Sequence, residues 1–96
     1  MQRVLVVDDD KVLQDSVRRA LEFHHFFVDV ADNGREAVNK VYREKYDLVV
    51  MDVNMPEMNG IEALVEMKKN NPSIIVIIVT AYSNVQDKDI KFINKK

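Results

Sequence analysis

Short apolar runs alternate with longer amphipathic segments along most of the chain. Four runs have the length and the β-branched or aromatic content of buried strands. They cover residues 4–7, 26–31, 48–51 and 74–79. Between them, apolar residues recur every three or four positions, which predicts helices. These helices cover residues 11–24, then about 33–45, and finally 61–69.

Each predicted helix has a stripe of apolar side chains to place against a sheet. The expected stripes are Val12, Leu13, Val17, Ala20 and Leu21 in the first helix, Ala37, Val38 and Val41 in the second, and Ile61, Leu64 and Val65 in the third. Asp10 and Asn33 stand where an N-cap accepts the free backbone N–H groups of a first helical turn. Pro56 and Gly60 interrupt regular structure between the third strand and the third helix.

The alternation of strands and helices predicts an α/β fold with a parallel sheet that is covered on both faces. Parallel strands share one direction, so their C-terminal ends lie at one edge, and open α/β sheets bind ligands there. Asp8, Asp9, Asp52 and Thr80 stand at or just past predicted strand ends. The fold therefore predicts a shared site at this edge.

Composition narrows the class of protein further. The 96 residues predict one domain, with 47% apolar residues for a core and 31% charged residues for a solvated surface. The formal net charge of −2 provides no basic field for nucleic acid. The sequence has no cysteine, so disulfides and thiolate metal sites are excluded. No run approaches the ~20 apolar residues of a membrane span, and no signal peptide is evident, so we expect a cytoplasmic protein.

Three or four carboxylates at neighbouring strand ends repel one another strongly unless a cation neutralises them. An oxygen-only ligand set favours a hard ion such as Mg²⁺. Asp8 and Asp9 are then ligands, with Asp52 and the backbone carbonyl of Asn54 in further positions. Asp52 is a candidate nucleophile, since a carboxylate can accept a phosphoryl group. The hydroxyl of Thr80 can donate a hydrogen bond to a phosphoryl oxygen.

Three segments carry a resemblance to a known family: V-V-D-D-D at residues 6–10, M-D-V-N-M-P-E-M-N-G at residues 51–60, and T-A-Y at residues 80–82. They resemble the receiver domain of bacterial two-component response regulators, over residues 1 to about 82. The resemblance implies the flavodoxin-like fold, a doubly wound parallel sheet with strand order 2-1-3-4-5.

The resemblance also implies a function, which is a conformational switch and at most a slow self-phosphorylating and self-dephosphorylating protein. A histidine kinase or phosphotransfer protein donates a phosphoryl group to Asp52. The implied Mg²⁺ ligands are Asp8, Asp9, Asp52 and the Asn54 carbonyl. Thr80 senses the phosphoryl group, while Asn54 and Tyr82 flank the site and influence how long that group survives.

Residues 83–96 depart from the family pattern. Residues 90–95 can form a fifth strand, which makes Phe92 the aromatic switch residue and Lys95 the phosphoryl-contacting lysine. The segment 83–89 is short for a fourth helix, and a fifth helix is absent. Such an ending leaves one sheet face uncovered, so we expect either a destabilised monomer or a homodimer in which a second copy covers it.

Two alternatives remain open at this point. Residues 8–13 also fit the D-x-D-x-[TV]-[LV] pattern of haloacid-dehalogenase-like phosphatases, in which Asp8 is the nucleophile. The unusual ending instead allows a receiver remnant that no longer signals and acts as an assembly surface.

Overall fold

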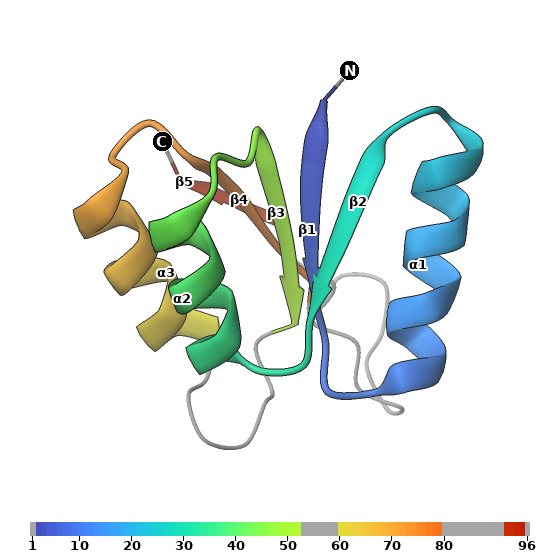
Figure 1. The fold of residues 1–96 in the computed structure, drawn as a ribbon. Helices are drawn as coiled ribbons and strands as arrows, with labels where there is room; N and C mark the ends of the chain where they lie inside the picture. Colours follow the sequence, from blue (N-terminus) through green and yellow to red (C-terminus); the bar gives the residue numbers. More distant parts are fainter. Residues whose placement is uncertain (1, 53–59, 80–91, 96) are drawn as a thin grey trace.

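The fold is built on one five-stranded sheet with strand order β2-β1-β3-β4-β5 (Figure 1). The computed structural model describes residues 2–52, 60–79 and 92–95. The strands are β1 (Arg3–Val7), β2 (Phe27–Ala31), β3 (Leu48–Asp52), β4 (Ile75–Val79) and β5 (Phe92–Lys95). The helices are α1 (Lys11–Phe23), α2 (Gly34–Arg43) and α3 (Gly60–Asn70). The predicted strands and helices are all present, with small differences at their ends.

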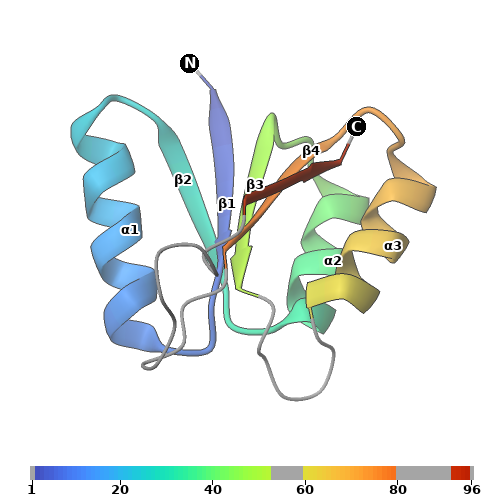
Figure 2. The same ribbon diagram turned by 180° about the vertical axis from the view of Figure 1, so that it is seen from behind.

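The first four strands are parallel in the order 2-1-3-4, as the alternation of elements predicts. Helix α1 lies on one side of the sheet, and α2 and α3 lie on the other (Figures 1 and 2). This arrangement confirms the doubly wound, flavodoxin-like fold for the four parallel strands. None of the helices in the described ranges is long and apolar enough to cross a bilayer.

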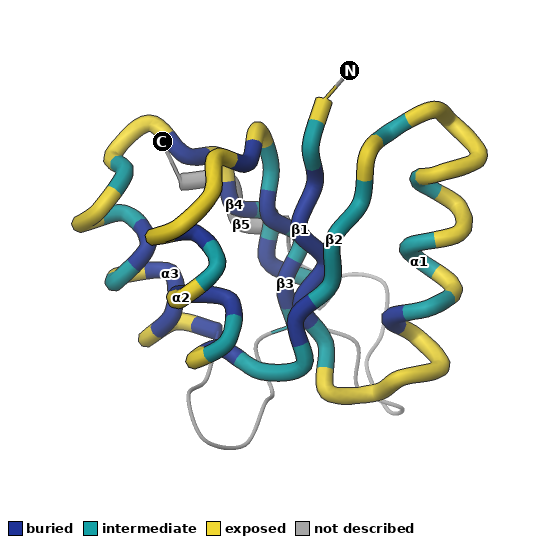
Figure 3. Tube along the Cα trace, in the orientation of Figure 1, coloured by how far each residue is buried: buried dark blue, intermediate teal, exposed yellow. Residues whose placement is uncertain are grey.

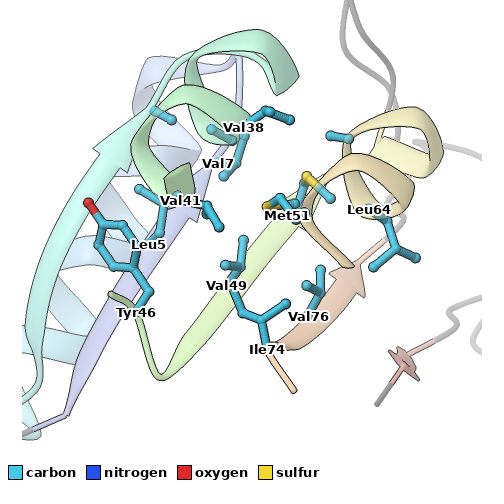
Figure 4. Packing of buried hydrophobic residues seen from close by; sticks show 14 of the residues in the cluster. Leu5, Val7, Val38, Val41, Tyr46, Val49, Met51, Leu64, Ile74 and Val76 are labelled. Atoms are coloured by element: carbon cyan, nitrogen blue, oxygen red, sulfur yellow. The ribbon is translucent and has the colours of Figure 1, made fainter. Parts of the chain in front are cut away.

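The main core lies between the sheet and the pair α2–α3 (Figure 4). Its strand residues alternate with residues of the opposite sheet face, as a pleated strand requires. They are Leu5, Val7, Val49, Met51, Val76 and Ile78, each at most 1% exposed. The predicted stripe of α2 is confirmed, since its three residues are buried. The stripe of α3 is partly wrong: Ile61 and Val65 are about half exposed, and Ala63 and Met67 join Leu64 in the core.

The predicted stripe of α1 is also partly wrong. Val12 is 75% exposed and Leu13 is 49% exposed, whereas the buried residue of this helix is the polar Gln14. Most of α1 is exposed or intermediate in burial (Figure 3). Within the described residues, the main contacts of helix α1 with the sheet are to β1 and β2, so a narrow side of the helix faces inward. The apolar residues beside that narrow side stay partly solvated.

Strand β5 forms within the expected segment 90–95, but it runs antiparallel to β4. The parallel direction that the family resemblance implied for this strand is therefore wrong here. A parallel return requires a crossover of a dozen or more residues, usually with a helix. Only residues 80–91 connect β4 to β5, so the chain is at the lower limit for a crossover, whereas an antiparallel return is compatible with a shorter connection.

Candidate metal and phosphoryl site

The site begins where β1 and β3 end side by side. Val7 pairs with Met51 in the parallel register, so the residues that follow, Asp8 and Asp52, emerge next to each other. Each of Asp8, Asp9 and Asp52 offers a carboxylate oxygen, and the three oxygens lie within 4.8 Å of one another. The predicted meeting of the two strand ends is therefore present in the fold.

Backbone and side-chain hydrogen bonds hold the turn between β1 and α1. The Asp8 N–H donates to the Ala31 carbonyl over 3.1 Å, which extends the contact with β2 beyond the strand. The Asp10 N–H donates to Oδ1 of Asp8 over 2.9 Å. Asp10 is the N-cap of α1, and its carboxylate accepts the N–H groups of Val12 and Leu13. The predicted capping role is confirmed, and the Asp10 carboxylate is occupied away from the acidic cluster.

The surroundings of Asp8 oppose the ionisation of its carboxyl when no cation is bound. Burial raises the pKa of Asp8, the Asp10 N–H lowers it, and the negative charges of Asp52 and Asp9 raise it again, with a net upward shift. The shift follows from placing like charges together in a partly desolvated turn. A bound cation removes this cost.

The three carboxylates fit a small, hard divalent ion. Mg²⁺ takes oxygen ligands at about 2.1 Å, so ligands on opposite sides of the ion are about 4.2 Å apart. The three oxygens lie within 4.8 Å of one another, so small side-chain rotations would bring them onto one ion. Asp8 and Asp52 are partly buried and Asp9 is exposed, so water can complete an octahedral shell.

The chain also matches a known family over nearly its whole length. Residues 4–93 match the response regulator receiver domain. The chain belongs to this family. The acidic cluster at the ends of β1 and β3 therefore lies within a receiver domain.

Similar proteins agree with this membership. The chain is 35% identical over 86 residues to response regulator MprA of Mycolicibacterium vanbaalenii, covering 90% of this chain and 37% of that protein. It therefore spans little more than a third of the length of this curated relative. MprA of Mycobacterium leprae is 34% identical over the same length.

Solved structures show the same fold. Response regulator TrrA of Thermotoga maritima, in complex with Mg²⁺ and beryllofluoride, has a TM-score of 0.82 and 37% identity, covering 86% of this chain and 72% of that one. A CheY-like receiver domain of Methanospirillum hungatei has a TM-score of 0.83 and 34% identity, covering 88% and 68%. In another structure TrrA is in complex with the histidine kinase ThkA, with a TM-score of 0.81, 36% identity and coverage of 91% and 75%.

The remaining predicted site residues have different outcomes. Asn54, Thr80 and Tyr82 lie outside the described residues. Phe92 pairs with Val79, at the end of β4 that lies next to Asp52. Its proposed role as the switch residue remains a prediction.

The backbone of Lys95 lies away from the site edge. In the antiparallel register it pairs with Val76, three residues before Val79, whereas Asp52 pairs with Val79 itself. At about 3.3 Å per residue, the Lys95 backbone lies about 10 Å back along the sheet from the site edge. The prediction that Lys95 contacts a phosphoryl group is not supported by this register, because the strand returns in the direction opposite to the one assumed.

Sequence reasoning missed three residues beside the cluster. Nε2 of the buried Gln14 donates to the Asp8 carbonyl and to Oδ1 of Asp32, and Nζ of Lys11 donates to the same Asp32 oxygen. These contacts lower the pKa of the Asp32 carboxyl, with the Gln14 hydrogen bond as the largest cause. A signal was present in the sequence, since Asp32 directly follows β2 just as Asp8 follows β1.

The phosphatase alternative loses its support at Asp10. The second acid of the D-x-D pattern is Asp10, and its carboxylate caps α1 and is not among the clustered acids of the described residues. The family membership points the same way.

Proposed function

We propose that the domain is a phosphoacceptor switch in which Asp52 receives a phosphoryl group from a phosphohistidine. The observation that carries the proposal is the convergence of Asp8, Asp9 and Asp52 oxygens within 4.8 Å at the end of the parallel sheet. A nucleophilic carboxylate beside two metal-binding carboxylates is the arrangement that phosphoryl transfer to an acid requires.

In the proposed step, an oxygen of Asp52 attacks phosphorus in line with the bond to the donor imidazole nitrogen. The new O–P bond forms as the N–P bond breaks, and the imidazole nitrogen keeps the electron pair and takes up a proton. When bound, Mg²⁺ offsets the charge on the phosphoryl oxygens during this transfer. Asp8 and Asp9 hold that ion, and the Asn54 carbonyl is proposed as a further ligand.

The proposed donor is a histidine kinase or a phosphotransfer protein. Support comes from TrrA, which has the same fold and forms a complex with the kinase ThkA.

We propose that Thr80 and Phe92 report the modification, with Asn54 and Tyr82 controlling access of water to the acyl phosphate. Slow self-phosphorylation and hydrolysis are the expected extent of catalysis. Because a kinase forms its phosphohistidine from ATP, we propose a cytoplasmic location.

A small acyl phosphate should modify the protein once, and only when Mg²⁺ is present. Acetyl phosphate supplies the same phosphoryl group without a kinase, so the chemistry of the site is tested alone. The measurement is intact mass after incubation with Mg²⁺ or with EDTA. The expected result is one phosphoryl adduct with Mg²⁺ and none with EDTA. Equal labelling in EDTA would contradict a site that works through the acidic cluster.

We also propose that two copies associate through the α1 side of the sheet. Leu13 and Val17 of α1, with Val50 and Val79 of the sheet, line a groove of about 180 Å³ on that side. Burying such apolar surface stabilises an interface by about 25 cal/mol per Å². In an isologous pairing of two copies, this apolar groove of one copy would face the same groove of the other.

Light scattering at tens of micromolar should therefore detect a dimer. Leu13→Glu should shift the protein to monomer, because the new charge would be buried in the interface. Val65→Glu on α3 is the matched control, since both residues are 49% exposed and only Leu13 lines the groove. A well-folded wild-type monomer, or equal effects of the two substitutions, would reject the proposed interface.

A further inference from the structure

Among the described residues, Gln14 is the one buried residue with an amide or charged side chain, at 6% exposure. It lies on α1, one turn after the N-cap Asp10, at the position that faces the ends of β1 and β2. A buried amide without partners would be costly, so a side chain of this kind is retained where it has specific acceptors.

The acceptors of Gln14 are close together at the site. Its Nε2 lies 3.1 Å from the Asp8 carbonyl oxygen, 3.0 Å from the Ala31 carbonyl oxygen and 3.0 Å from Oδ1 of Asp32. The carbonyls of Asp8 and Ala31 lie at the ends of β1 and β2, where the backbone leaves each strand towards the helix that follows it. The Ala31 carbonyl also accepts the Asp8 N–H. The two hydrogens of the Gln14 NH₂ group are shared among the three acceptors, so the amide connects the turn after β1 to the turn after β2.

This connection acts on the backbone of a proposed metal ligand. Repulsion among Asp8, Asp9 and Asp52 pushes the turn after β1 away from β3 whenever the cluster lacks a cation. The Gln14 amide opposes that movement by holding the Asp8 carbonyl from the α1 side, while the Asp8 N–H is held by Ala31. The amide itself carries no charge and is not among the clustered acids.

From this geometry we propose that Gln14 is a positioning residue that sets the affinity of the acidic cluster for Mg²⁺. The proposal rests on the proposed function, because it assumes that Asp8, Asp9 and Asp52 bind the ion. Groups that orient metal ligands typically change affinity by roughly 10- to 100-fold when they are removed. Gln14→Met keeps the length and volume of the side chain and removes both N–H donors.

The test is the dissociation constant of Mg²⁺, measured by calorimetry on wild type and two variants. Gln14→Met should raise it by roughly 10-fold or more. Tyr46→Phe is the matched control, because it also removes one buried donor, the hydroxyl that donates to Asp29 over 2.8 Å. Tyr46 follows α2, before β3 begins and far from the acidic cluster, so its loss should leave Mg²⁺ affinity within about twofold of wild type, whatever it does to stability. Equal affinities for Gln14→Met and wild type would overturn the proposal.

A measurement on the wild-type protein removes any dependence on the folding of the variant. The side-chain NH₂ signals of Gln14 should shift on addition of Mg²⁺ in NMR spectra, because the Asp8 carbonyl they contact moves with its carboxylate. Unmoved signals at saturating Mg²⁺ would also overturn the proposal. Failure of wild type to bind Mg²⁺ or to form the phosphoryl adduct would reject the proposed function instead, so the two failures are distinguishable.

Discussion

Asp52→Asn should abolish the phosphoryl adduct completely while leaving the domain folded. An amide matches the carboxylate in shape but has no anionic oxygen to attack phosphorus. The substitution also removes one of three charges that attract the cation. The loss of one partner from a partly desolvated charge contact costs about 2–5 kcal/mol, so Mg²⁺ affinity should fall roughly 30-fold or more. Intact mass after acetyl phosphate treatment and calorimetry with Mg²⁺ measure the two effects.

The control for Asp52→Asn is Asp15→Asn, which removes one carboxylate from α1 outside the acidic cluster. It should leave both the adduct and the Mg²⁺ affinity unchanged. Peptide mapping gives the result that would count against Asp52. An adduct that persists in Asp52→Asn and maps to Asp8 would revive the phosphatase-like use of the first strand end, and one that maps elsewhere would remove the acidic cluster from the chemistry.

The acidic site was predictable because strand direction and strand ends can be read locally. A continuous apolar run that stops at Asp8 or Asp52 fixes the end of a strand, and the alternation with helices fixes a common direction. Those two facts bring the acids together whatever the details of packing. The caps at Asp10 and Asn33 were predictable for the same reason, since each acts on its own helix within three residues.

The features that sequence reasoning missed depend on contacts between elements that are far apart in the sequence. From the sequence alone, Gln14 is expected to be a solvated helix residue. Its burial follows from its hydrogen bonds to carbonyls at the ends of β1 and β2. Val12 and Leu13 were predicted to be core residues, yet among the described residues α1 makes its main sheet contacts with β1 and β2, and both side chains stay exposed. The direction of β5 is a third case, because a strand pattern is the same in either direction and only its pairing with β4 decides. The distance of the Lys95 backbone from the site edge follows directly from this direction.

Asp8→Asn should change stability in opposite directions with and without Mg²⁺. In EDTA at neutral pH the variant should be more stable than wild type, because the ionised Asp8 is partly desolvated and faces two other carboxylates. The gain should be about 0.5–1 kcal/mol, since the side chain is still partly solvated and its interactions are screened. The amide oxygen of Asn can still accept the Asp10 N–H, so the turn keeps its hydrogen bond.

With Mg²⁺ the order should reverse. Wild type gains about 2.7 kcal/mol at a Mg²⁺ concentration 100 times its dissociation constant, whereas the variant, lacking one ligand, gains much less. Urea denaturation of both proteins in the two conditions measures the crossing. The control Asp15→Asn should lose the same amount of stability in EDTA and in Mg²⁺. The hydrogen bond from Arg18, which lowers the pKa of Asp15, is lost in this variant and does not involve the acidic cluster.

The pH dependence of the EDTA experiment gives a separate check on the cause. The raised pKa of Asp8 means that the folded state holds its proton more tightly than the unfolded state does. Wild type therefore loses stability relative to Asp8→Asn as pH rises from the ordinary value of 3.8 through the pKa of the folded state, and the difference stays constant above it. At pH values well below 3.8 the Asp8 carboxyl of wild type is protonated in both the folded and the unfolded state. The part of the stability difference that comes from its charge should then vanish. A difference that does not change with pH would mean that packing, and not charge repulsion, distinguishes the two proteins.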